Sequence, residues 1–305
     1  MTQSATRFGP LLMLVATGAA WGLTLPLIRI GVSTGHQPLG IVLWQKLIMV
    51  AVCGALVVAL RLPFPPVRRS LGLYAGVAVF GAVLPGYFTY MTAVDLPAGV
   101  RAIIIAMVPM FVLPMALALG FERPDARRAF GVLLGAAAIF AIALPGAGLT
   151  PAIGLGVILL ALVAPLSYGI EANFLAWRGS DGLHPFQLLL GASALGAALT
   201  WPMAAASGQT LDLARGFGVA EAAILAAGVL NALAYAGYVW LVGRAGSLFA
   251  SQIAYLVTGF GVVWSKLLLG ETYAPLVWAA FALILGGVAL VQPRPAPANA
   301  DPGPR

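Results

Sequence analysis

The sequence predicts an all-α membrane protein with ten transmembrane helices, arranged as two inverted five-helix repeats. Three observations support this prediction. The composition is extremely apolar, the chain divides into apolar stretches long enough to cross a bilayer, and its two halves resemble each other. Together they indicate that most of the chain is surrounded by lipid.

The composition excludes an ordinary soluble domain. Of the 305 residues, 61% are hydrophobic and 8% are charged, whereas soluble domains carry roughly 25% charged residues. A net charge of +7 would suit a nucleic-acid partner in a soluble protein. Here the basic residues stand singly or in small groups between apolar runs, so we interpret them as topology signals. We expect the lipid bilayer as a partner and no nucleic acid.

Residues for metal, cofactor or catalytic chemistry are sparse. Cys53 is the only cysteine, and His36 and His184 belong to different loops, so we expect no disulfide within the chain and no metal site. The sequence contains no phosphate-binding loop, no zinc-protease motif and no convincing Ser–His dyad. We therefore expect no cofactor and no enzymatic activity. An intramembrane enzyme and a passive channel remain the alternatives to a transporter.

Apolar stretches define the helices, because about 20 apolar residues are needed to cross a bilayer about 30 Å thick. The first run, 8–28, exceeds a secretory signal segment, so we interpret it as an uncleaved span. Residues 129–170 carry no charge, but the Pro/Gly-rich segment 145–151 predicts a turn between two helices. The expected spans are 10–31, 39–60, 70–92, 97–119, 127–145, 152–176, 185–206, 219–241, 247–269 and 274–291.

The distribution of basic residues sets the orientation. With a cytoplasmic N-terminus, the outer segments keep only Arg215, with Arg29, Arg101 and Lys266 at outer helix ends, where long side chains reach the interface. We therefore expect a multi-pass protein of the cell inner membrane with both termini cytoplasmic, and a disordered tail over 292–305. The inner segments then hold Arg7, Arg61, Arg68, Arg69, Arg123, Arg127, Arg128, Arg178, Arg244, Arg294 and Arg305.

An internal repeat links the two halves. Four short motifs recur in the same order at a nearly constant spacing, which predicts a duplicated unit over 10–145 and 152–291. Because five crossings are an odd number, the second copy is inverted, as is typical of secondary transporters. The matched pairs are Trp21-Gly22 with Tyr168-Gly169, Gln37-Pro38 with His184-Pro185, Glu122 with Glu271, and 130–135 with 281–286.

At these residues the sequence resembles the EamA family of the drug/metabolite transporter superfamily, over 10–291. The chain departs from the family pattern at Lys46, where arginine is usual, and at Thr258, which replaces the second-copy proline. The resemblance implies a cavity lined by helices one to four and six to nine, and export of a small metabolite, amino acid or drug. The motifs that carry it are Trp21-Gly22, Lys46, Pro109, Gly120-Phe121-Glu122, Tyr168-Gly169 and Leu269-Gly270-Glu271.

Two ionisable residues lie within spans, where each costs about 2.5–3.5 kcal/mol at a helix centre on insertion scales. Lys46 is either a counter-ion for an acidic group or a packing anchor bonded to backbone carbonyls. Glu171 is either a proton-coupling site or amine ligand, or a side chain that reaches for the interface near Trp177-Arg178. We expect separate partners for the two, and Ser167 beside Glu171 in any cavity.

Polar residues within the spans supply the other candidates for substrate binding or coupling. Asn231, Tyr235 and Tyr238 share one face of the eighth helix, as a cavity wall or as hydrogen-bonding contacts between helices. Trp21 either stacks on a substrate ring or fills space. Tyr90 and Thr258 complete the set, and we expect Tyr168 and Asn173 to share a polar pocket with Glu171.

Three further motifs favour structural roles. We expect Glu122 and Glu271 to cap the N-termini of the fifth and tenth helices. Prolines within spans, at positions 26, 85, 109, 114 and 165, should kink or break them, and Pro109 with Pro114 frames a flexing point. Gly131 and Gly135, with the matching Gly286-Gly287, permit close helix packing.

The sequence therefore predicts a secondary transporter, with export as the favoured direction and alternating access as the mechanism. The expected partners are a small-molecule substrate and a proton as coupling ion. A monomer and a homodimer fit the sequence equally.

The orientation gives a first testable prediction. Reporter fusions at both termini should give cytoplasmic signals, and a fusion at Asp212 should give an external signal, because the basic residues favour the cytoplasmic side. A cytoplasmic signal at Asp212, or an external terminus, would contradict the topology.

Overall fold

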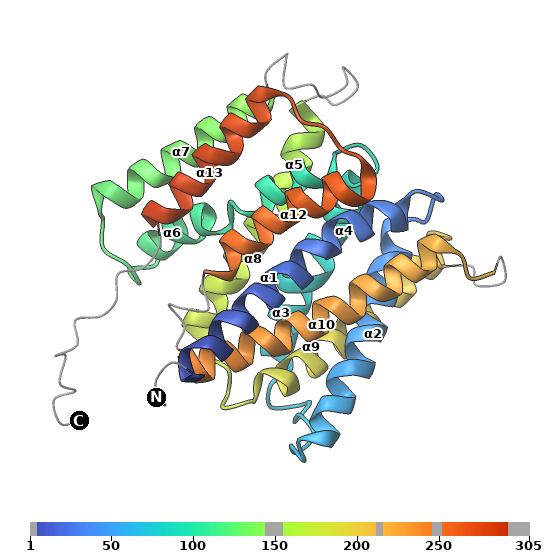
Figure 1. Cartoon of the computed structure of the whole chain (residues 1–305). Helices are drawn as coiled ribbons and strands as arrows, with labels where there is room; N and C mark the ends of the chain where they lie inside the picture. The colour runs from blue at the N-terminus through green and yellow to red at the C-terminus, as the bar shows by residue number, and fades with distance from the viewer. Residues whose placement is uncertain (1–4, 144–154, 212–215, 246–251, 292–305) are drawn as a thin grey trace, which may run out of the picture.

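The computed structural model of the chain describes residues 5–143, 155–211, 216–245 and 252–291, and within these ranges its secondary structure is helical, without strands (Figure 1). The expected turn at 145–151 and the tail at 292–305 lie outside the described residues. The helices are α1 Ala5–Val32, α2 Pro38–Ala59, α3 Leu71–Ala78, η1 Val79–Val83, α4 Leu84–Thr92, α5 Ala98–Ile105, α6 Val108–Ala118, α7 Ala126–Ala143, α8 Leu155–Arg178, α9 Pro185–Ala206, α10 Val219–Ala245, α12 Ile253–Leu269 and α13 Pro275–Val291.

Seven helical stretches among the described residues are long and apolar enough to cross a membrane. The other expected spans are shorter or more charged. α12 and α13 have 17 residues each, and α7 carries Arg127 and Arg128 in its first turn. The number of crossings therefore stays a prediction. The seven stretches are Gly9–Val32, Pro38–Ala59, Leu71–Thr92, Ala98–Ala118, Leu155–Arg178, Pro185–Ala206 and Val219–Leu241.

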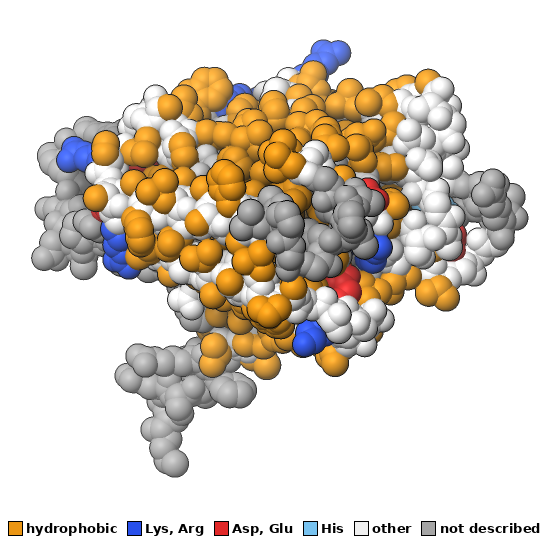
Figure 2. Space-filling model, turned by 90° about the horizontal axis from the view of Figure 1, so that it is seen from above, with side chains coloured by type: hydrophobic (Ala, Val, Ile, Leu, Met, Phe, Trp, Pro, Cys, Tyr) orange, Lys and Arg blue, Asp and Glu red, His pale blue; other side chains and the backbone are white. Residues whose placement is uncertain are grey.

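The surface suits a lipid environment. Figure 2 shows a face covered largely by hydrophobic side chains, with few charged groups. Large apolar side chains such as Phe140, Trp201 and Leu267 are more than half exposed. A soluble monomer rarely exposes so much contiguous apolar surface, so this face is one that lipid covers.

Two of the expected spans are interrupted. The third consists of α3, the π-helical segment η1 and α4, and Pro85 lies in the first turn of α4. The fourth stops at Ile105 and resumes at Val108, so that Pro109 lies in the first turn of α6, where its missing N–H is tolerated. Thr258, the counterpart of Pro109, lies inside the continuous helix α12 and donates to the carbonyl of Ala254 at 2.9 Å.

The packing of the helices has an internal correspondence. α1 packs against α10 and α12, and α8, its counterpart in the second half, packs against α4 and α6. α2 pairs with its counterpart α9, and α7 pairs with α13. Figure 1 shows α1 lying between α10 and α12, with α7 and α13 side by side at one edge. Exchanging the two halves therefore reproduces the main packing partners.

The repeated aromatic-Gly motif makes equivalent contacts in both halves. A Cβ added at Gly22 would lie 2.8 Å from the Cβ of Phe260 on α12. A Cβ added at Gly169 would lie 2.9 Å from the Cβ of Phe111 on α6. Each glycine thus lets its helix approach the opposite half closely. The preceding aromatic residues, Trp21 and Tyr168, both line the central cavity.

Glycines also join the two peripheral helices. A Cβ at Gly131 of α7 would lie 2.7 Å from the carbonyl oxygen of Gly287 on α13, and the reverse distance is the same. Gly135 lies against the sulfur of Met110. The glycines serve helix packing, as the sequence suggested.

The Gly169 contact gives a second prediction. Gly169→Val should lower stability by about 1–3 kcal/mol, because the new side chain overpacks the contact between α8 and α6. Unfolding of the purified protein in mixed detergent micelles measures this change. Gly156→Val on the same helix is the control, since nothing lies within 4 Å of a Cβ at Gly156. An equal loss in both variants would show that helix propensity, rather than packing on α6, sets the effect.

Candidate functional site

A cavity of about 630 Å³ lies between the two halves of the chain. Its wall takes residues from every expected span except the fifth and tenth, so α7 and α13 stay outside it. This is the set of helices that the family resemblance implied. The volume is within the roughly 300–1,000 Å³ typical of small-molecule sites.

All eight candidate residues line this one cavity: Trp21, Lys46, Tyr90, Glu171, Asn231, Tyr235, Tyr238 and Thr258. They come from six expected spans, so folding brings together side chains that lie far apart in sequence. Their placement follows from their polarity. A polar group facing lipid would be unsatisfied, whereas one facing a cavity can meet water or a ligand.

Lys46 and Glu171 are the two charged side chains among the described residues that line the cavity. Neither makes a hydrogen bond or an ion pair with another described residue. They interact electrostatically across the cavity without touching. No bond to a carbonyl of the described residues supports the interpretation of Lys46 as a packing anchor. Both charged groups are therefore available to a ligand.

Glycines lie beside the two charged side chains, and the one beside Glu171 makes room for it. A Cβ at Gly81, in the π-helical segment η1, would collide with the carboxylate of Glu171. The carboxylate thus lies against the third span rather than reaching for the interface. A Cβ at Gly196 of α9 would lie 3.4 Å from Cδ of Lys46. π-helical segments often occur at functional sites, and here one faces the acidic group.

An aromatic cluster forms the wall between α1 and α10. Trp21 Nε1 donates to Oδ1 of Asn231 at 2.7 Å. The ring centroid of Trp21 lies 6.5 Å from that of Tyr235 and 6.2 Å from that of Tyr238. Asn231 therefore both lines the cavity and bonds two helices together, so the two interpretations of the α10 face hold at once. Trp21 is held in place by this bond with its ring on the cavity.

Two expected neighbours of Glu171 lie elsewhere. Ser167 is buried outside the cavity and donates to the carbonyl of Val163 at 2.7 Å. Asn173 donates to the carbonyl of Val112 at 3.1 Å and so joins α8 to α6. Both predictions were wrong, because each side chain bonds to backbone carbonyls outside the cavity. Tyr168 does share the cavity with Glu171.

The expected caps were also wrong. Glu271 accepts hydrogen bonds from the backbone N–H groups of Ala98 and Gly99 at 2.7 and 3.1 Å, so it caps α5 in the other half rather than α13. The hydroxyl of Tyr273 also donates to it, at 2.5 Å, and this bond contributes to a raised pKa of the phenol, together with burial, the largest cause.

At the start of α7 the N–H group of Arg127 donates to Oδ1 of Asp125 at 2.9 Å. Glu122 instead forms an ion pair with Arg128 at 2.7 Å. Asp125 therefore supplies the cap that was expected from Glu122.

Arg101 departs from its expected place at a lipid interface. Its side chain is buried, and Nη2 donates to the carbonyl of Leu25 at 2.8 Å. Arg29 donates to the carbonyls of Ala93 and Val94, just after the end of α4. Both arginines satisfy backbone carbonyls near the Glu271 end of the bundle, and Lys266 lies over the ring of Trp278 at 5.5 Å.

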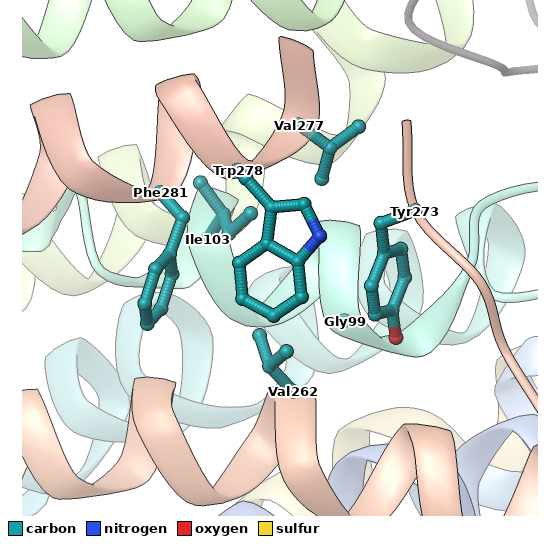
Figure 3. Close-up of a pocket in the computed structure, with 7 residues that line it drawn as sticks. All are labelled: Gly99, Ile103, Val262, Tyr273, Val277, Trp278 and Phe281. Carbon is teal, nitrogen blue, oxygen red and sulfur yellow. The ribbon is translucent and has the colours of Figure 1, made fainter. Parts of the chain in front are cut away.

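A second, smaller crevice lies between α5, α12 and α13 (Figure 3). Figure 3 shows the rings of Tyr273, Trp278 and Phe281 along it, with Val262 below. The crevice has no room for a water molecule, so the larger central cavity is the candidate site. The described residues hold no group of three or more metal-ligating side chains.

The family model described as "EamA-like transporter family" matches the chain twice, over 8–144 and 155–292. The chain belongs to the EamA-like transporter family. This EamA-like protein is therefore a multi-pass membrane transporter, as the motifs suggested. The two matches divide the chain close to the expected boundary between its halves.

Known relatives agree with the family. The chain is 27% identical over 285 residues to the "Uncharacterized inner membrane transporter YedA" of Escherichia coli strain K12, covering 89% of this chain and 86% of the relative. The same values hold for YedA of E. coli O157:H7. A solved structure titled "Crystal structure of protein" has a TM-score of 0.61 at 18% identity, covering 92% of this chain and 96% of that chain. At this identity the match shows a shared fold.

The bond between Trp21 and Asn231 gives a third prediction. In a double-mutant cycle, Trp21→Phe and Asn231→Ala should show a coupling of about 1 kcal/mol, because each change alone removes the same interhelical hydrogen bond. Unfolding in mixed micelles measures the cycle. The control cycle pairs Trp21→Phe with Tyr235→Phe, which share a ring contact only. Equal coupling in both cycles would contradict a specific role for the bond.

Proposed function

We propose that this EamA-like transporter carries a small metabolite, amino acid or drug across the membrane by alternating access. The observation that carries the proposal is the cavity between the halves, with two opposite charges that have no partner among the described residues. Unpaired charges within a membrane protein are expensive and mark substrate or ion pathways. A ligand between two similar halves is in the position where secondary transporters bind their substrates.

Several polar contacts between the halves lie at the Glu271 end of the bundle. Besides the Glu271 cap on α5, His36 contacts Glu221 at 2.5 Å, and the N–H group of Leu39 donates to the side chain of Gln209 at 3.2 Å. Opening this end requires these bonds to break. Alternating access requires bonds of this kind, which form when one end of the cavity is closed and break when that end opens.

The proposal includes a topology. Ten crossings, made by two inverted five-helix repeats with both termini cytoplasmic, are consistent with the matched packing of α1 and α8 and with the distribution of arginines. This orientation makes the Glu271 end extracellular. The contacts at that end then close the path to the outside, as expected of an exporter that loads its substrate from the cytoplasm.

Proton coupling is the second part of the proposal, and Glu171 is the candidate carrier. Its carboxylate lies in the cavity without a hydrogen-bond donor among the described residues. It can therefore take up a proton or a cationic group without breaking an existing bond. Exchange of one for the other would link the movement of substrate to that of a proton.

Transport in sealed vesicles tests the function. The purified protein in proteoliposomes should give saturable uptake or efflux of labelled metabolites, and a pH gradient should change its rate. Unsaturable flux would favour a channel, whereas product formation in detergent, where no compartments exist, would favour an enzyme. Either outcome would overturn the proposal.

Glu171→Gln gives a fourth prediction. It keeps the shape of the side chain and removes its charge, so transport should fall at least tenfold or lose its response to the pH gradient. Glu122→Gln is the matched control, because Glu122 forms an ion pair with Arg128 away from the cavity. Normal expression with parental transport by the Glu171 variant at every pH would contradict the coupling role.

A further inference from the structure

We propose that the substrate is a zwitterion with an apolar body, whose carboxylate binds Lys46 and whose ammonium group binds Glu171, so that it joins the two halves of the chain. This inference rests on the proposed function and narrows its substrate class. The inference follows from how many charged side chains line the cavity, from their signs, and from the helices that carry them.

The first step is charge balance. Among the described residues that line the cavity, one side chain is cationic and one is anionic, and neither has a partner. A ligand with a single charge would pair with one of them and leave the other buried without a partner, which is costly in a low-dielectric site. A zwitterion satisfies both and leaves the cavity neutral.

The second step is the position of the charges. Lys46 comes from α2 in the first half, and Glu171 comes from α8 in the second half. They lie too far apart for an ion pair, since none within 4 Å forms between them, yet they interact electrostatically. A ligand between them that carries both charges can therefore contact Lys46 and Glu171 at once and so connect the two halves. Ligands that contact both halves favour the state in which the halves close around them.

The third step is the remaining wall, which is mostly apolar and aromatic. The rings of Trp21, Tyr235 and Tyr238 lie within about 6.5 Å of one another on one side. Aliphatic side chains such as Leu25, Met49, Leu188 and Val257 line other parts. Such a wall accommodates an apolar or aromatic body, whereas a sugar or a polyol would leave hydroxyl groups without partners. The cavity thus selects a molecule that is charged at two points and apolar elsewhere.

The fifth prediction is a binding order within matched triplets. The probes are leucine, phenylalanine and tryptophan, each compared with the amine that lacks its carboxylate and the acid that lacks its ammonium group. Thermal shift and tryptophan fluorescence of the purified protein in detergent report binding. In at least one triplet the amino acid should bind roughly 10- to 100-fold more tightly than its amine and its acid, because each analogue lacks one charged contact.

Two variants assign the contacts. Lys46→Met should weaken amino-acid binding and strengthen binding of the amine, since the lysine charge no longer goes unpaired. Glu171→Gln should shift the preference toward the acid. Lys266→Met and Glu122→Gln are the matched controls, because both residues lie outside the cavity, and they should keep the parental order. Lys46→Arg keeps the charge and should keep the preference for the amino acid.

The outcomes separate the two proposals. The substrate class is wrong if no amino acid of the panel binds more tightly than both of its analogues, whether or not any probe binds. It is also wrong if the two cavity variants keep the parental order. The comparison of each amino acid with its two analogues uses the parent protein, so it tests the substrate class even if a variant fails to fold. Saturable transport of another metabolite in proteoliposomes would then leave the proposed function intact. Selective binding of an amino acid without its transport in sealed vesicles would overturn the proposed function, whereas the proposed binding site would stand.

Discussion

Backbone N–H and C=O groups in the hydrocarbon core of a membrane find no water, so each must bond within the protein. This constraint explains why the described chain is helical and where its helices stop. The third and fourth spans depart from regular α-helix at η1 and between α5 and α6, and both breaks border the cavity. The N-terminus of α5 is satisfied by Glu271 from the other half, and carbonyls that follow α4 are satisfied by Arg29. Irregular backbone is thus confined to places where a partner side chain or the cavity is available.

The same constraint gives the cavity its chemistry. Several polar side chains of the bundle bond between helices, as Asn173 does to α6 and Gln45 does to the carbonyl of Ile224. Lys46 and Glu171 instead face the cavity, and neither has a partner within the part of the chain that the structure describes. Trp21 combines both uses, because it bonds Asn231 and presents its ring to the cavity. The site therefore combines a fixed aromatic wall with two charges that only a ligand or water can satisfy.

Much of this site could be predicted from the sequence, because a charge or a polar group inside an apolar run stands out. Lys46, Glu171 and the α10 face were found in this way. The roles of Glu271, Arg101 and Ser167 were not, because the sequence does not indicate which backbone group each side chain meets. Glu271 meets α5 of the other half, Arg101 meets a carbonyl of α1, and Ser167 meets a carbonyl of its own helix. Gly81 was missed because nothing in the sequence of the third span indicates that it faces Glu171. Tyr168 was expected beside Glu171, and its correspondence to Trp21 in the repeat indicates the same place, since both residues line the cavity.

The equivalent contacts of Gly22 and Gly169 imply a mechanical balance. At each glycine a helix of one half packs closely on the other half, and an added Cβ would lie at nearly the same distance from the facing Cβ, 2.8 and 2.9 Å. If the two halves exchange conformations during a transport cycle, the two contacts exchange their surroundings as well. A bulkier residue at one of them would then separate the helices in only one half of the protein. Glycine at both positions therefore keeps the packing of the two halves equivalent, so that neither conformation is favoured by these contacts. A larger residue at either position would then shift the resting state toward one side of the membrane, although neither glycine is among the residues that line the cavity.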